Sequence, residues 1–188
     1  AGWAGAGAVL TRSGSGWRVS DKLVPDAGAI GVSTVAGWQV GRSVAIDGDW
    51  IALGAPRASF TDSNGVAWAE AGAVLMYRFA GTSWAFERVL ISGAPSHFEH
   101  FGYAVDMDAG MLVAGIPNAD SSDDTNGNQG AIEIFNTSAG AWTRVTRFSA
   151  PVFSTIGSRF GESVAVHGST IAVGEPGYAA DRGRAWVL

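Results

Sequence analysis

Short apolar runs, separated by turns rich in glycine and polar residues, recur along the whole chain. Residues 101–135 show the pattern most clearly, because they predict in turn a strand, a tight turn, a strand, a long polar loop and a third strand. The same order recurs at residues 41–56 and 160–176. No apolar stripe with helical spacing reaches a useful length. The pattern therefore predicts an all-β protein built from a repeated unit.

Fixed spacings mark this repeat. The glycine that opens each copy recurs 61 and then 59 positions later, and so does the proline that follows the second strand. These residues are Gly41, Gly102 and Gly161, and Pro56, Pro117 and Pro176. A tryptophan opens a fourth strand after each third strand, at Trp17, Trp84 and Trp142, and packing between neighbouring units would explain it. Four short strands with a period of about 60 residues are typical of a β-propeller blade.

Each of the four strands has its own character. The first is rich in small residues, which suits the crowded centre of a propeller. The second is apolar nearly throughout, at residues 111–115 for example, and is expected to be buried on both faces. The third strand alternates between apolar and polar residues, most clearly at residues 131–135. The fourth carries the tryptophan and more charge, and suits an outer edge.

These residues resemble the FG-GAP repeat family, whose blades form the heads of integrin α subunits and occur in many bacterial surface and secreted proteins. The FG element corresponds to residues 101–102 and 160–161, with Trp38 in the place of the phenylalanine in the earliest copy. The GAP element corresponds to residues 54–56, 115–117 and 174–176. The resemblance implies an all-β fold: a β-propeller of four-stranded antiparallel blades.

The predicted blades divide the chain, which is expected to be a single propeller segment over residues 1–188. The predicted boundaries are residues 7–37 for the end of a blade, 38–100 and 101–159 for two blades, and 160–188 for the start of another. This amounts to about three blades, whereas propellers usually have about 4–8. Two interpretations stay open: the chain is part of a longer protein, or further copies of it complete a ring.

An acidic loop is the main candidate for a metal site. Its hard oxygen ligands, the type that calcium prefers, come from Asp120, Asp123, Asp124, Asn126 and Asn128. Calcium is therefore the one cofactor that the sequence suggests. A solvated polar loop is the alternative, because Asp and Asn are also standard turn residues. In integrin blades, a loop between the first and second strands binds calcium. The corresponding turns of this chain are short and lack the ligands, so the resemblance does not imply calcium binding there.

Two further groups of residues are candidate sites. Trp50 and Trp68 have no equivalent elsewhere in the repeat, and as loop aromatics they are candidate ligand-binding residues. Folding back onto their own blade is the alternative. His97 and His100 have metal-ligand spacing only on a helix, and they lie where no helix is expected, so a surface linker is favoured.

Composition narrows the class of function. The net charge is −5, with no run of Lys or Arg, which argues against nucleic acid as a partner. No apolar stretch approaches the length of about 20 residues that spans a bilayer. The chain has no cysteine, which excludes thiolate sites, and no catalytic constellation stands out, so we expect no enzyme activity. The sequence thus predicts a secreted, cell-surface or periplasmic module that binds a protein or glycan through propeller loops. The alternative is a structural subunit whose ring is completed by further blades from the same or another chain.

Overall fold

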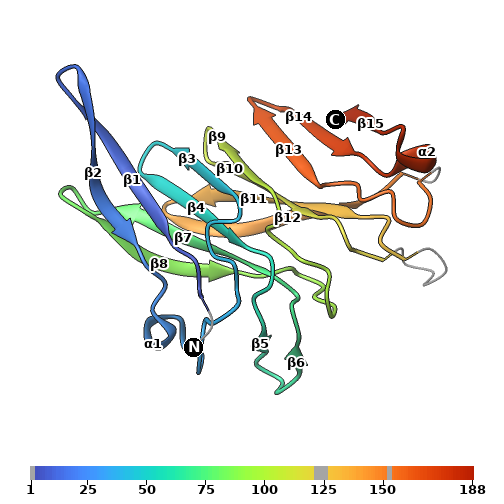
Figure 1. Ribbon diagram of the computed structural model, residues 1–188, viewed down its shortest axis with the longest axis horizontal. Helices are drawn as coiled ribbons and strands as arrows, with labels where there is room; N and C mark the ends of the chain where they lie inside the picture. The colour runs from blue at the N-terminus through green and yellow to red at the C-terminus, as the bar shows by residue number, and fades with distance from the viewer. Residues whose placement is uncertain (1–2, 121–126, 152–153) are drawn as a thin grey trace.

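The computed structural model describes residues 3–120, 127–151 and 154–188. It is an all-β structure of antiparallel sheets with two short helical segments. The sheets succeed one another along the longest axis of the molecule, from β1 at one end to β15 at the other (Figure 1). The predicted all-β class with antiparallel pairing is therefore confirmed.

Two sheets have four strands, each joined to its neighbours in chain order. The first consists of β3 (Val44–Asp47), β4 (Trp50–Ala55), β7 (Ala73–Phe79) and β8 (Trp84–Leu90). The second consists of β9 (Val105–Asp108), β10 (Met111–Ile116), β11 (Ala131–Ser138) and β12 (Ala141–Ser149). β8 and β12 are outer strands with mostly exposed or half-buried side chains, as expected for the fourth strand of the repeat.

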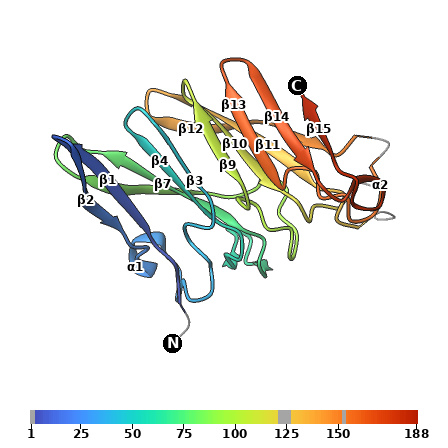
Figure 2. The ribbon, with the colours of Figure 1, turned by 45° about the horizontal axis from the view of Figure 1, so that its top comes forward.

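Smaller sheets and two helical segments complete the fold. The smaller sheets are β1 (Gly7–Ser13) with β2 (Gly16–Leu23); β13 (Ser163–His167) and β14 (Thr170–Glu175) with β15 (Arg184–Val187); and the hairpin of β5 (Phe60–Thr61) and β6 (Ala67–Trp68). The helical segments are α1 (Ala27–Ile30) and α2 (Tyr178–Asp181). Figure 2 shows the first strands β3, β9 and β13 side by side, with their hairpin turns at the same edge of the molecule.

The same backbone joint links each sheet to the next. Gly72, just before β7, forms a parallel bridge with Phe101, and Gly130 forms the same bridge with Phe160. Both phenylalanines are completely or almost completely buried at these joints. In the earliest copy the equivalent bridge joins Gly5 to Val40, so Val40 and not Trp38 takes the place of the phenylalanine. The prediction for Trp38 was wrong by two positions, although its indole is buried in the core.

Glycine is required where the sheets approach most closely. A Cβ on Gly115 would lie 1.9 Å from the carbonyl oxygen of Gly161, and one on Gly54 would lie 2.1 Å from that of Gly102. In these two copies the glycine of the GAP element therefore faces the glycine of the FG element in the following sheet. The repeat spacing of the two motifs reflects a backbone contact between neighbouring sheets.

The core differs from the expected pattern at three places. The second strands β4 and β10 are buried along nearly their whole length, as predicted, but β14 alternates between buried and exposed side chains. The third strand β11 does not alternate, because Glu133 is fully buried between apolar neighbours. Its carboxylate accepts hydrogen bonds from the Ser92 hydroxyl and the Gly93 N–H of the preceding connection. Trp17 was expected to pack between units, yet it is 68% exposed.

Across the described ranges, neither helical segment has the length and apolar character needed to cross a membrane.

Candidate functional site

A cleft of about 580 Å³ opens where the connecting loops of two sheets meet. One wall is the connection before β3, residues 31–38, and the other is the β5–β6 hairpin with His97. The residues that line it combine aromatic rings with small hydroxyl side chains, and the latter are Ser33, Thr34, Ser59 and Thr61. Mixed apolar and hydrogen-bonding surface in a concave site of this volume is typical of small-ligand binding.

The hairpin holds Trp68 in a fixed orientation. Asp62 organises its tip, because one carboxylate oxygen accepts hydrogen bonds from the N–H groups of Asn64 and Val66, both at 2.9 Å. The other oxygen accepts a hydrogen bond from the indole Nε1–H of Trp68 at 3.1 Å. Trp68 therefore has its only polar atom satisfied by its own hairpin, which leaves the ring face for apolar contacts.

These contacts also fix the charge of Asp62. The hydrogen bond from the Val66 N–H, with those from Trp68 and Asn64, lowers the pKa of this carboxyl below its ordinary value. The ionised form is the one that accepts all three hydrogen bonds. Asp62 is thus a carboxylate at neutral pH, and the indole orientation is retained there.

Two aromatic side chains extend the surface beside Trp68. The ring of His97 lies 5.4 Å from that of Trp68, and the ring of Phe98 lies 6.2 Å from that of His97. His97 Nδ1 accepts a hydrogen bond from the Ala69 N–H, so the neutral ring carries its proton on Nε2, where it is a donor. Phe98 is 56% exposed and has a left-handed backbone, a strained conformation that loops at binding sites often contain.

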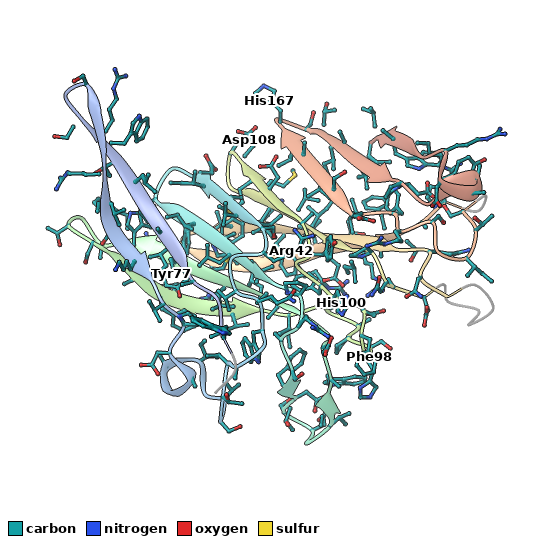
Figure 3. All side chains as sticks on the ribbon, viewed as in Figure 1. Arg42, Tyr77, Phe98, His100, Asp108 and His167 are labelled. Atoms are coloured by element: carbon teal, nitrogen blue, oxygen red, sulfur yellow. The ribbon has the colours of Figure 1, made fainter. Side chains whose placement is uncertain are left out.

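An ion-pair cluster supports the base of these loops. Glu70 pairs with Arg57 at 2.8 Å and with His100 at 3.3 Å. The hydrogen bond from Arg57 lowers the pKa of Glu70 despite partial desolvation. His100 also contacts the Asn118 amide at 2.9 Å, which ties the hairpin of one sheet to the loop of the next. Figure 3 shows Phe98 and His100 close together on this side of the molecule.

The two predicted ligand-binding tryptophans have different positions. Trp68 lines the cleft, as a ligand-binding residue must. Trp50 does not line it. It begins β4, and its half-buried ring meets Trp142 edge-on at 5.5 Å, with the Arg78 guanidinium 5.3 Å from the ring centre. Trp50 therefore packs between two sheets, and its role in ligand binding stays a prediction.

The predicted metal loop is described only at its ends. Asp123, Asp124 and Asn126 lie outside the described residues. One Asp120 carboxylate oxygen accepts a hydrogen bond from the Asn128 N–H at 2.8 Å. In the ranges that the structure describes, no group of three or more His, Cys, Asp or Glu residues could hold a metal ion. His97 and His100 are each engaged by different groups, in keeping with their expected place in a linker.

Sequence reasoning missed part of this site. Phe60 and Phe98 were not assigned to it, because they belong to no motif. His97 was considered only as a metal ligand. A signal was present, since the equivalent linker of the next copy, residues 154–158, contains no aromatic residue. Aromatic residues confined to one copy of a repeat are not needed for the fold, which makes them candidates for binding.

In the comparisons with known proteins, no protein-family model matches this chain and no curated protein matches it.

Proposed function

We propose that this chain is a recognition module without enzyme activity, of the secreted, cell-surface or periplasmic kind. We further propose that its successive sheets are blades of a β-propeller of the FG-GAP type. The order of four strands in each complete sheet, the period of about 60 residues and the repeated backbone joint support this assignment. Fold alone does not dictate function, so the binding role is argued from the cleft.

The single observation that carries the proposal is the fixed indole of Trp68 at the wall of the cleft, with His97 beside it. A protein ligand or a glycan could be bound there, and the surroundings favour a glycan. A sugar presents an apolar ring face and a rim of hydroxyls. Trp68 supplies the flat apolar partner, while the His97 Nε2 donor and the hydroxyls of Ser33 and Thr61 supply polar partners around it.

Binding can be tested with an array of neutral oligosaccharides, followed by calorimetry with the best probe. Replacing Trp68 by Ala should weaken binding about ten-fold or more, because it removes the stacking surface. Trp17→Ala is the matched control, since Trp17 is 68% exposed and lies outside the cleft. Equal affinity of Trp68→Ala and the parent protein would refute the cleft, and so would equal losses in both variants.

A second function, as a structural subunit completed by neighbouring chains, is favoured by a separate observation. An apolar groove of about 450 Å³ lies between β1 and the β3–β4 hairpin. Leu10, Val44 and Ile46 line it and are 54%, 62% and 62% exposed. Added strands from another chain could cover such a surface. Light scattering would then give a mass of at least twice the 19.3 kDa protomer, whereas a strict monomer would contradict assembly.

Calcium binding by the acidic loop is kept as a proposal. Its carboxylate and amide oxygens suit calcium, with Asp120 and Asn128 at its two ends. Isothermal titration with calcium chloride, with Asp120→Asn as the variant, tests it: heat of binding that the variant weakens is expected, and no heat from the parent protein would refute it.

A further inference from the structure

A second cavity, of about 590 Å³, lies where the first strands of three successive sheets begin. It shares no lining residue with the cleft around Trp68. Its walls come from the residues before β3 and β9, the start of β13, and the end of β14 with the start of β15. Three structural repeats therefore contribute to one space, which no single repeat could form.

One repeat position places three different side chains along this cavity. Arg42, Tyr103 and Glu162 each follow the glycine that opens a copy, and they are 61 and 59 positions apart. The next two positions of the repeat are uniform, with a small residue at 43, 104 and 163 and a valine at 44, 105 and 164. A cation, an aromatic ring and an anion at equivalent positions are not required by the fold, which tolerates all three.

The Arg42 guanidinium is held in place without being neutralised. It donates a hydrogen bond from Nη2 to the Tyr103 hydroxyl at 2.8 Å and lies 4.4 Å from the centre of the Tyr103 ring. Throughout the described ranges, no carboxylate oxygen lies within 4.0 Å of it. Its remaining N–H donors keep the planar fork that suits a carboxylate.

The other charged groups around the cavity are already paired. Arg184 forms a two-point contact with the buried Glu175, with its Nε 2.6 Å from one carboxylate oxygen. Glu162 pairs with Arg159 at 3.0 Å. The positive charge left over in the cavity is therefore that of Arg42. Glu162, partly exposed, can still accept hydrogen bonds through its other carboxylate oxygen.

We propose that this cavity binds a small hydroxylated carboxylate, of the size and chemistry of a hexuronate monosaccharide. The carboxylate contacts Arg42, and hydroxyl groups at the other end of the molecule donate to Glu162. The volume lies within the range of small-molecule sites, about 300–1,000 Å³. Glu162, Tyr103 and Arg42 lie in this order along the cavity and allow only one orientation of the ligand. In the reverse orientation, the carboxylate of the ligand would lie beside that of Glu162. This proposal does not rest on the function proposed for the cleft.

Titration of the protein with D-glucuronate, followed by calorimetry or by NMR, tests the site. Arg42→Gln should weaken binding about ten-fold or more, since it removes a charge-assisted hydrogen bond. Tyr103→Phe keeps the ring but removes the hydroxyl that holds the guanidinium, and should weaken binding about three-fold. Arg12→Gln, an exposed arginine on β1, is the matched control and should bind like the parent protein. Trp68→Ala should leave glucuronate binding unchanged, which separates this site from the cleft.

Two analogues of glucuronate test which group of the ligand binds at each end of the cavity. Glucose lacks the carboxylate and cyclohexanecarboxylate lacks the hydroxyls, so both should bind more weakly than glucuronate. The proposal is overturned if the parent protein does not bind glucuronate, if glucose binds equally well, or if Arg42→Gln and Arg12→Gln behave alike. Equal binding of cyclohexanecarboxylate would overturn the role of Glu162.

Discussion

Replacing Gly115 by Ala tests whether the GAP glycine is set by contact between sheets. Gly115 does not have a left-handed backbone, so alanine fits its local conformation. The added Cβ would, however, lie 1.9 Å from the Gly161 carbonyl oxygen, where ordinary contact begins at 3.4 Å. The two sheets would have to separate locally by about 1.5 Å, which follows from these two distances. Both sides of the contact are backbone, and no side-chain rotation can relieve it.

We expect this substitution to lower the free energy of unfolding by about 3 kcal/mol, the upper end for overpacking. For a chain of this size the melting temperature would fall by about 6–12 °C. Urea denaturation followed by tryptophan fluorescence measures the first quantity, and calorimetry the second.

Gly16→Ala is the matched control for this experiment. Gly16 also lacks a left-handed backbone, and the nearest atom to a Cβ there is 3.9 Å away. Its substitution should change the free energy of unfolding by less than about 0.5 kcal/mol. If Gly115→Ala costs no more than Gly16→Ala, the close approach of the sheets is not what selects glycine, and the physical basis given for the motif is wrong.

Two buried glutamates should give opposite pH dependence. Burial raises the pKa of Glu99 despite its pairing with Arg147. Its stabilising contribution is therefore complete below the unfolded-state pKa and is lost as the pH rises through the folded-state pKa. The stability advantage of the parent protein over Glu99→Gln should shrink as the pH rises above about 4, and a constant difference in urea midpoints would contradict this. At Glu175, burial opposes ionisation, but hydrogen bonds from Arg184, Ser154 and Trp186 outweigh it and lower the pKa. The contribution of Glu175 to stability is therefore present above its unfolded-state pKa and is lost as the pH falls through its folded-state pKa. The substitution Glu175→Gln should lower the free energy of unfolding by about 3 kcal/mol at neutral pH and by less in acid. A cost that grows on acidification would refute the ion-pair explanation.

Much of the local structure could be predicted from the sequence, because strands and tight turns have short-range signatures. The alternation of apolar runs and glycine turns located both four-stranded sheets, and the paired spacing of Gly102 and Pro117 with their equivalents gave the repeat. Errors began where a side chain depends on a neighbouring sheet. Strand β11 was expected to alternate in polarity at Glu133, yet the preceding connection buries this carboxylate with hydrogen bonds from Ser92 and Gly93.

The candidate site was predictable only in part. Trp68 was selected because it has no equivalent in the repeat, and the structure places it at the wall of the cleft. The same reasoning selected Trp50, which instead meets Trp142 of the next sheet. Uniqueness within a repeat indicates that a residue is not needed by every unit. It does not say whether the residue faces a ligand or a neighbouring sheet.

The sequence by itself determined the all-β class, the period of the repeat and the positions of the turns. These properties depend on backbone conformation and side-chain polarity over a few neighbouring residues. Only the tertiary structure brought Trp68 and His97 together across 29 positions of chain, and aligned Arg42, Tyr103 and Glu162 along one cavity. Such groupings depend on how successive sheets stack. The stacking is set by contacts such as that of Gly115 with Gly161, which are 46 positions apart along the chain.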